Sequence, residues 1–337
     1  MRNIIFDYAR LLRLPGLGGL SIAPVFGAIS VGVYDIKTLL LVFLIGAFSA
    51  IYGFVLNDYV DVEVDKLSKD LTNRPLVKGT ISKNIALLIC AICVIGAFTI
   101  IFVFFYKNQP SFYLGVLIIL LTAALGSIYD LFGKKFVGSD FLVALSEALL
   151  VLLGAFIVLE NGTVNIITWI IFILTFNQLL YMNAVVGGLK DVDHDYLKGV
   201  KNIALTSGVK VKKDKTLFVP LSFKVFGWGI RVFSAVILFF PILFYNVHYE
   251  IWQILLLVIF VLGVLLLSMQ FLTLKKFDRR RIRKLIMSQA LLRYSLVPLM
   301  LIPFIGLIST VILMLFPFIW YVTFTPLIGE KLFQPVA

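Results

Sequence analysis

Charged residues are scarce in this sequence. They make up 14% of the 337 residues, whereas hydrophobic residues make up 61%. A soluble domain needs a larger polar surface than this, so the composition excludes a soluble globular protein. It indicates an integral membrane protein instead.

Several other features are also missing. Cys90 and Cys93 are the only cysteines, and they lie in an apolar segment without a second pair or a nearby histidine. We interpret them as packing residues rather than as a redox or metal motif. No helix-turn-helix, zinc-finger or aromatic RNA-binding pattern indicates a nucleic-acid partner. The first apolar run follows a polar start, residues 1–13, and lacks a small-residue cleavage pattern at its exit, so we expect no cleaved signal peptide.

Long apolar runs are what the chain does have. A helix needs about 20 residues to cross roughly 30 Å of hydrocarbon, and the runs do not alternate as barrel strands do. The sequence therefore predicts an all-α membrane protein with nine transmembrane helices. The predicted spans are 17–34, 37–57, 84–105, 111–129, 138–159, 164–188, 222–245, 250–274 and 297–323. Residues 285–296 are interpreted as an interfacial lead-in to the last span.

Basic residues gather on one side of this arrangement. The N-terminal segment and the loops after spans two, four, six and eight hold 24 of the 30 lysines and arginines. The positive-inside rule therefore places the N-terminus and these loops in the cytoplasm, and an odd number of spans places the C-terminus outside. The net charge of +12 then reflects topology and attraction to anionic lipid, and we expect the plasma membrane as the location.

Acidic residues cluster where span two ends. Residues 57–65 read NDYVDVEVD, in which Asn57, Asp61 and Asp65 are spaced i, i+4, i+8. If the helix continues past the apolar run, these three side chains form one polar stripe, with Asp58 beside it. Like charges stacked near a membrane are costly, so we expect a cation to compensate them.

A second acidic cluster follows span six. Residues 191–195 read DVDHD, and Asp191 and Asp195 again stand i, i+4. Each cluster follows the second span of a four-helix group, which indicates two pseudo-repeated groups plus a last helix. If the groups pack around a shared cavity, the carboxylates would meet at its cytoplasmic mouth. Oxygen ligands suit Mg²⁺, and the lysines and arginines in the same loops suit a diphosphate.

These motifs carry a family resemblance. NDYVDVEVD at 57–65 resembles the first Asp motif of the UbiA-type intramembrane prenyltransferase superfamily, and DVDHD at 191–195 resembles its second. TNRPLVKGTIS at 72–82 and SIYDLFGKK at 127–135 are similar to the loops that follow spans two and four in that family. The likeness covers nearly the whole chain, so we treat residues 1–337 as a single polytopic domain.

The resemblance implies nine helices around a central cavity and a magnesium-dependent transfer of a polyisoprenyl group. The donor would be an isoprenyl diphosphate, geranylgeranyl or longer, and diphosphate would leave. Two Mg²⁺ ions are implied, one held by Asn57, Asp61 and Asp65 and the other by Asp191 and Asp195, while Asp58 also matches the signature. The diphosphate contacts implied or expected from the loops are Arg74, Lys78, Tyr129, Lys134, Lys198 and Lys201. His194 has no evident partner in the sequence.

One carboxylate lies deeper in the membrane. Glu147 stands about ten residues into span five. An acid at that depth faces a cavity or a partner, so Glu147 is either a catalytic group that orients or deprotonates the acceptor, or a hydrogen-bonded packing residue. The sequence leaves both interpretations open.

Two features of the sequence bear on the identity of the acceptor. The Asp65–Arg74 spacing is similar to that of family members that use 4-hydroxybenzoate, and GAFIVLENG at 154–162 resembles members that act on naphthoate-type precursors. This resemblance implies an aromatic quinone precursor of the hydroxybenzoate or dihydroxynaphthoate type. The alternative is a glycerol phosphate lipid, as in archaeal digeranylgeranylglyceryl phosphate synthases. An alternative of another class is an ion-coupled transporter, although transporters usually place such acids near the bilayer midplane on broken helices.

Overall fold

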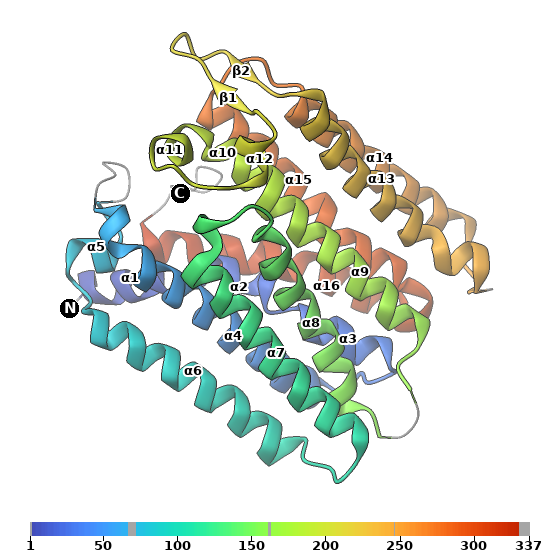
Figure 1. The fold of residues 1–337 in the computed structure, drawn as a ribbon. Coiled ribbons are helices and arrows are strands. Elements are labelled where there is room, and N and C mark those ends of the chain that lie inside the picture. Colours follow the sequence, from blue (N-terminus) through green and yellow to red (C-terminus); the bar gives the residue numbers. More distant parts are fainter. Residues whose placement is uncertain (1, 67–71, 161–162, 246, 330–337) are drawn as a thin grey trace. The chain divides into compact units, whose positions relative to one another are not determined.

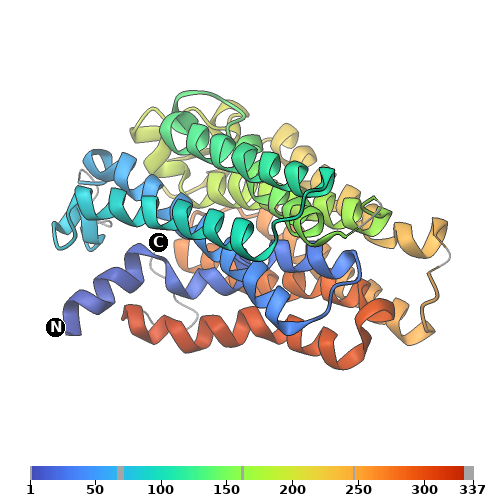
Figure 2. The same cartoon turned by 90° about the horizontal axis from the view of Figure 1, so that it is seen from below.

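A computed structural model describes residues 2–66, 72–160, 163–245 and 247–329. Within these residues nine helical segments are long and apolar enough to cross a membrane. They agree with the nine predicted spans in number, and the chain is an all-α membrane protein. Figures 1 and 2 show these long helices from two directions.

The helices are bounded as follows. The first half of the chain forms α1 (Arg2–Leu11), α2 (Leu14–Leu20), α3 (Ala23–Ser30), α4 (Ile36–Asp65), α5 (Pro75–Lys78), α6 (Lys83–Phe104) and α7 (Pro110–Phe132). The middle forms η2 (Gly133–Lys135), α8 (Asp140–Val158), α9 (Ile166–Leu180), π-helix η3 (Tyr181–Gly187), α10 (Gly188–Lys190), α11 (Val192–Leu197) and α12 (Ile203–Thr206). The remainder forms β1 (Lys210–Val211), β2 (Leu217–Phe218), α13 (Leu221–Phe244), α14 (Ile251–Leu272), α15 (Arg279–Met300), α16 (Ile302–Phe324) and η4 (Thr325–Ile328).

The chain divides into two compact units. Unit 1 comprises Met1–Leu131, Leu149–Thr168 and Phe316–Ala337, and unit 2 comprises Phe132–Ala148 and Trp169–Leu315. The units are therefore not the two consecutive four-helix groups of the predicted repeat. The assignment of residues 1–337 to one functional domain stays a prediction.

Unit 1 holds its helices together through glycines that allow backbones to touch. A Cβ atom built on Gly27 of α3 would lie 1.9 Å from the carbonyl oxygen of Val151 in α8. A Cβ on Gly154 would likewise lie 2.0 Å from the carbonyl oxygen of Pro24. Both distances are far inside van der Waals contact, so only glycine fits where α3 crosses α8.

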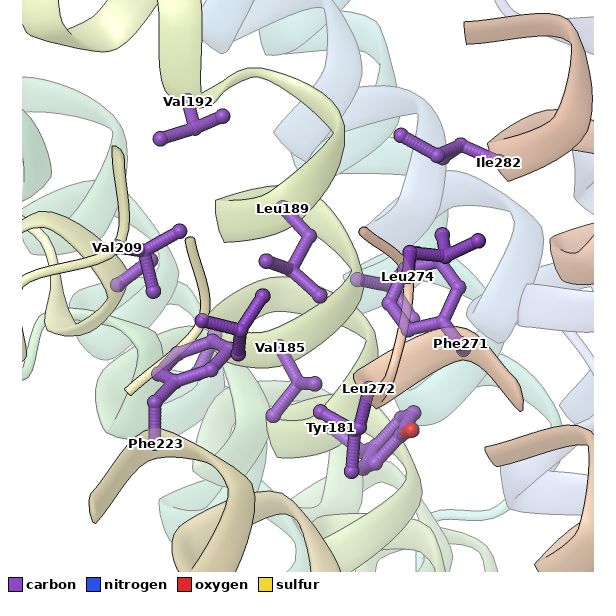
Figure 3. Close-up of a cluster of buried hydrophobic side chains, with 14 of the residues drawn as sticks. Tyr181, Val185, Leu189, Val192, Val209, Phe223, Phe271, Leu272, Leu274 and Ile282 are labelled. Atoms are coloured by element: carbon purple, nitrogen blue, oxygen red, sulfur yellow. The ribbon is translucent and has the colours of Figure 1, made fainter. Parts of the chain in front are cut away.

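Unit 2 is organised around a large apolar core. The buried side chains of η3, α10, α13 and α14 meet there, and Figure 3 shows Tyr181, Val185 and Leu272 grouped together at its lower end. The antiparallel hairpin β1–β2 joins α12 to α13, with Lys210 paired to Phe218. The chain after the sixth span thus returns to the same core instead of leaving it.

Helix α15 differs from the sequence prediction. Near its start, Arg279 contacts Asp193, which follows the sixth span. At its end, the carbonyl oxygen of Met300 accepts a 2.6 Å hydrogen bond from Tyr249, which precedes α14. Residues 285–296 therefore belong to a 22-residue helix that reaches from one end of unit 2 to the other. The prediction of an interfacial segment is wrong, because the buried polar residues of α15 lowered its apparent hydrophobicity.

This extra passage changes the direction of the last span. In unit 1, the Arg10 side chain donates a 2.8 Å hydrogen bond to the carbonyl oxygen of Ile328, and Trp320 donates to Leu14. Figure 2 shows the red α16 beside the blue α1 and α2. The last span thus ends beside the N-terminal helix, which favours the same side of the membrane for both ends, whereas an odd number of spans predicted opposite sides. The final residues, 330–337, lie outside the described residues.

Candidate functional site

The first acidic motif lies on one continuous helix. Helix α4 runs for 30 residues and ends at Asp65, so it carries the motif two turns beyond the apolar run. This extension was predicted from the spacing. Asp58, Asp61 and Asp65 are buried, with exposed fractions of 5%, 7% and 3%. Their spacing of i, i+3 and i+7 puts them on one face, whereas Asn57 lies to its side.

Two arginines neutralise this face. Arg74 places Nη1 3.0 Å from Asp58 Oδ1 and 2.6 Å from Asp65 Oδ2, so one nitrogen bridges the two carboxylates. Arg13 places Nη2 2.9 Å from the same Asp58 oxygen. We call Arg13, Asp58, Asp61, Asp65 and Arg74 the first half-site. Charge-assisted bonds of this kind are strong where the carboxylates are withdrawn from water.

Local backbone geometry brings both arginines to the acids. Arg13 adopts a left-handed conformation, φ 46° and ψ 44°, at the junction between α1 and α2. Its guanidinium lies 4.7 Å from the centroid of the Phe54 ring, one turn before Asp58. Arg74 occupies an extended position before Pro75, which starts α5, because proline disfavours the helical conformation in the preceding residue.

The flanking residues of the motif have other partners. Asn57 donates a 3.3 Å hydrogen bond from Nδ2 to Oδ1 of Asp130, next to the predicted Tyr129. Lys78 lies 4.0 Å from Asp7, which is buried in α1. Tyr129, Asn57 and Lys78 therefore lie in unit 1, as the first half-site does. Lys78 is held there by its contact with Asp7, which links α5 to α1.

The second acidic motif forms a tight turn in unit 2. Asp191 precedes α11, and its main-chain oxygen accepts from the amide of Asp195 at 2.9 Å. Asn202 accepts from the amide of Leu205 and donates 2.8 Å to Asp195, so it caps α12 and holds the acid. Asparagine suits this double role because its amide carries both an acceptor oxygen and a donor nitrogen. Asp191, Asp195, Lys134, Lys198 and Asn202 form the second half-site.

The electrostatics of this turn favour a bound cation. Burial, followed by repulsion from Asp191, raises the pKa of Asp195 to about 6, although Lys134, Lys198 and Asn202 act in the opposite direction. The amide of Lys201 donates 3.1 Å to the carbonyl oxygen of Lys134, which fixes the basic loop after α7 against the one after α11. Lys134 and Lys198 thus act on the Asp195 carboxylate, and Lys201 is held to the Lys134 loop through its main chain.

The other residues of this motif serve the scaffold. Asp193 pairs with Arg279 of α15 at 2.9 and 3.1 Å and accepts from the amide of His194. Its carboxylate therefore fastens the motif to α15. Glu147 lies on α8 within unit 2 and is partly exposed, and it has no hydrogen-bond or ion-pair partner in the described part of the chain.

The donor types of the two half-sites fit a divalent metal. Across the described residues, no three Asp, Glu, His or Cys side chains are close enough to hold an ion by themselves. Mg²⁺ usually takes only one or two carboxylates and completes its shell with water and substrate phosphate, so this does not argue against it. The bridge from Arg74 shows that a cation is accommodated between Asp58 and Asp65.

Sequence reasoning missed Arg13 and Asn202 as members of these sites, and Asp130 as the partner of Asn57. In the sequence, Arg13 contributes only to the count of basic residues that sets the topology. Asp130 lies next to Tyr129, which the family resemblance singles out instead. The usable signal was charge: Asp130 and Arg13 flank apolar spans in which a lone ionised side chain needs a partner. No sequence pattern indicates that Arg13 takes a left-handed conformation.

Comparison with known proteins gives consistent results. The UbiA prenyltransferase family model matches residues 20–292. Digeranylgeranylglyceryl phosphate synthase of Saccharolobus solfataricus is 32% identical over 212 residues, which are 60% of this chain and 69% of that protein.

Two solved structures share the fold. One, from work on digeranylgeranylglyceryl phosphate synthase in membranes, has a TM-score of 0.66 and 20% identity and covers 90% of this chain and 100% of its own. The other, a UbiA homologue of Archaeoglobus fulgidus bound to GPP and Mg²⁺, has a TM-score of 0.62 and 18% identity and covers 88% and 99%.

Proposed function

Because this chain belongs to the UbiA prenyltransferase family, we propose that it transfers an isoprenyl group from an isoprenyl diphosphate to a glycerol phosphate lipid. It is an integral membrane prenyltransferase, and the acceptor is the part that is proposed. The observation that carries the proposal is the pair of acidic motifs, each surrounded by basic side chains in its own unit.

The acceptor differs from the one that sequence reasoning favoured. The similar protein of Saccharolobus solfataricus is a digeranylgeranylglyceryl phosphate synthase, and the comparisons give no support to a quinone precursor. A glycerol phosphate lipid presents a free hydroxyl as the nucleophile and a phosphate as a recognition group. Both fit an enzyme whose loops are basic and whose spans are apolar.

The metal has candidate ligands in both half-sites. Asp58, Asp61 and Asp65 of the first and Asp191 and Asp195 of the second would hold Mg²⁺, with Asn57 offering an amide oxygen beside the first. When bound, Mg²⁺ would neutralise negative charge that develops on the leaving diphosphate. The homologue of Archaeoglobus fulgidus was solved with Mg²⁺ and GPP, which supports this assignment, and we propose two ions.

The basic side chains bind and orient the donor. Arg74 and Arg13 bring guanidinium groups to the first acidic motif, and Lys134 and Lys198 bring ammonium groups to the second. Guanidinium groups bind phosphate oxygens in pairs, so they can fix the diphosphate in one orientation. Lys78, Lys201 and Tyr129 are further proposed contacts. These groups stabilise the leaving diphosphate electrostatically.

The remaining roles concern the acceptor and the surroundings. Glu147 is proposed to accept the proton of the attacking hydroxyl, since it lacks a partner among the described residues. Apolar spans exclude water, which protects the allylic carbon from hydrolysis. The concentration of basic loops supports a cytoplasmic active site in the plasma membrane.

One experiment tests this function directly. Detergent-solubilised protein is incubated with geranylgeranyl diphosphate, Mg²⁺ and either geranylgeranylglyceryl phosphate or 4-hydroxybenzoate, and prenylated product is measured. We expect product with the glycerol phosphate lipid and none with the aromatic acid, and loss of product in excess EDTA. Product from the aromatic acid alone would reject the acceptor, and full turnover in EDTA would reject the metal. A transporter would release no diphosphate with either acceptor.

A further inference from the structure

Unit 2 contains a buried group of polar side chains that the proposed reaction does not use. It consists of Arg231 of α13, Arg293 and Gln289 of α15, and Asn177 and Tyr181 on α9 and η3. All five are at least nine-tenths buried, with exposed fractions between 0% and 8%. We call them the buried cationic cluster. Two guanidinium groups at membrane depth are costly unless negative charge compensates them.

Arg231 is held in a fixed orientation. Its Nε donates 3.2 Å to Ser268 and its Nη1 donates 2.9 Å to Gln178. The guanidinium lies 3.6 Å from the centroid of the Tyr181 ring, so a cation–π contact supports its plane. The remaining nitrogen, Nη2, is buried and has no acceptor in the described part of the chain. Two hydrogen bonds and one ring contact therefore hold the guanidinium, while Nη2 remains able to donate to a ligand.

Arg293 adds a second charge to the same place. Its Nη1 touches the sulfur of Met182, which neighbours Tyr181, and its Nε is buried without an acceptor among the described residues. Arg231 and Arg293 repel one another electrostatically, and each also interacts electrostatically with Tyr181. Gln289 stands four residues before Arg293, so the two side chains share one face of α15.

Donors outnumber acceptors in this cluster. Five buried donors have no hydrogen-bond acceptor within the described residues: Arg231 Nη2, Arg293 Nε, Asn177 Nδ2, Gln289 Nε2 and the Tyr181 hydroxyl. The unused acceptors of these side chains within the described residues are the amide oxygen of Gln289 and the hydroxyl oxygen of Tyr181. Among the described residues, neither arginine forms an ion pair with a carboxylate, and their electrostatic partners are tyrosines and each other. Such an imbalance calls for a ligand that is rich in oxygen and negatively charged.

We propose that the buried cationic cluster binds the phosphate monoester of a lipid, and specifically the phosphate of the glycerol phosphate acceptor. A phosphate monoester has up to two negative charges and several acceptor oxygens, which match two guanidinium groups and three neutral donors. An apolar chain is required because the cluster adjoins the hydrophobic core, where Figure 3 shows Tyr181 next to Leu272 and Val185. The assignment of this phosphate to the acceptor rests on the proposed function.

The position along the chain suits an acceptor. Tyr181 precedes Asp191 by ten residues of η3 and α10, so the cluster lies at most about 15 Å along the helix from the second acidic motif. Arg293 contacts Met182 at the near end of that interval. An acceptor bound by its phosphate here could direct its hydroxyl and the adjoining carbon chain towards the acidic end of unit 2.

A binding measurement tests the site without any turnover. The melting temperature of the full-length protein in detergent, without metal or donor, is followed with dodecyl phosphate and with uncharged dodecanol. We expect dodecyl phosphate alone to raise it, and expect Arg231→Lys and Arg293→Gln to remove the rise. Arg281→Gln, an exposed arginine of the same helix, serves as the matched control and should keep it. An equal response to both probes, or an unchanged response in both variants, would overturn the site.

A gain of charge gives a second, opposite test. Gln289→Glu is nearly isosteric and supplies an internal carboxylate next to Arg293. If the cluster binds an anion, the new carboxylate should raise the melting temperature above that of the wild type. Dodecyl phosphate should then no longer raise the melting temperature of this variant. A lower melting temperature with an intact response would mean that the cluster is only a packing arrangement.

The acceptor assignment is tested separately. The KM for geranylgeranylglyceryl phosphate is compared with that for the dephosphorylated lipid, in wild type and in Arg293→Gln. We expect the variant to raise the first KM by about ten- to hundredfold, the loss of one charged hydrogen bond, and to leave the second unchanged. If dodecyl phosphate binds but no glycerol phosphate lipid is prenylated, the proposed function fails while the anion site stands. Inorganic phosphate that binds as well as dodecyl phosphate would reject a lipid ligand.

Discussion

At the scale of single residues, Arg74 determines the charge balance of the first half-site. It is the cation that Asp58 and Asp65 share, and both acids are almost fully buried. A substrate diphosphate would compete with the carboxylates for the Arg74 guanidinium, and a metal ion would compete with Arg74 for the carboxylates. We therefore expect Arg74 to stabilise the metal-free site, and to be available for phosphate if a metal ion occupies the carboxylates.

We predict that Arg74→Gln destabilises the metal-free protein by about 2–4 kcal/mol, because two buried carboxylates lose their shared partner. Adding Mg²⁺ should recover more stability in this variant than in the wild type. Thermal unfolding in detergent with and without Mg²⁺ measures both effects. Lys66→Gln is the matched control, since it removes an exposed pair with Glu63 and should change stability by less than about 0.5 kcal/mol. Equal effects of Mg²⁺ on both proteins would contradict this role.

A second residue-scale prediction concerns Glu147. If it accepts the acceptor's proton, Glu147→Gln should bind the donor normally and lower single-turnover transfer by about 10²–10⁴-fold. A packing residue should tolerate this near-isosteric change with a normal rate. Calorimetry gives the donor affinity and rapid quench gives the rate on the same preparation. A rate within threefold of the wild type would remove Glu147 from the catalytic groups.

At the scale of elements, the crossing of α3 and α8 fixes how unit 1 is built. Gly27 and Gly154 let two backbones meet at a distance that no side chain permits. Because the atoms in the way are carbonyl oxygens, neighbouring side chains cannot relieve the clash by changing rotamer. The crossing is thus an all-or-none feature of the packing.

We predict that Gly154→Ala prevents normal folding of unit 1, since the added Cβ would lie 2.0 Å from the carbonyl oxygen of Pro24. Gly53→Ala is the matched control in α4, where a Cβ meets nothing within 4 Å. It should be neutral or stabilising by up to about 1 kcal/mol, the difference in helix propensity. The yield of monodisperse protein and its melting temperature measure both variants. A well-folded Gly154→Ala protein would show that the two helices can separate without loss.

Sequence patterns predicted some elements well and others poorly. The extension of α4 to Asp65 followed from the i, i+4, i+8 spacing, because a helical stripe is a local property. Helix α15 escaped detection because Arg293 and Gln289 are buried by contacts that only the tertiary structure provides. The same limit applies to the site: the acids and lysines were visible in the motifs, whereas the ion pair between Arg74 and Asp58 is a tertiary contact that no local pattern predicts.

At the scale of the whole molecule, the side of the membrane reached by the last span is the testable feature. In a background with Cys90 and Cys93 replaced by serine, single cysteines are introduced as Asn73→Cys, Asn108→Cys and Leu327→Cys. We expect a membrane-impermeant thiol reagent added outside intact cells to label Asn108→Cys only. The reason is that Ile328 lies beside Arg10, at the end of unit 1 that the basic loops occupy. Labelling of Leu327→Cys from outside would support the nine-span topology predicted from the sequence, in which the C-terminus lies outside.

The composition of unit 1 has a consequence for biosynthesis. Its three chain segments are separated by the segments of unit 2, and the last begins only at Phe316. A ribosome must therefore release nearly the entire polypeptide before Trp320 and Ile328 can meet α1 and α2. Until then, the surfaces of α1 and α2 that contact the end of α16 and η4 would lack their partner. We expect quality-control proteases to act on such incomplete chains. Nascent chains arrested before residue 316 should be degraded faster than those arrested just after the full sequence has emerged.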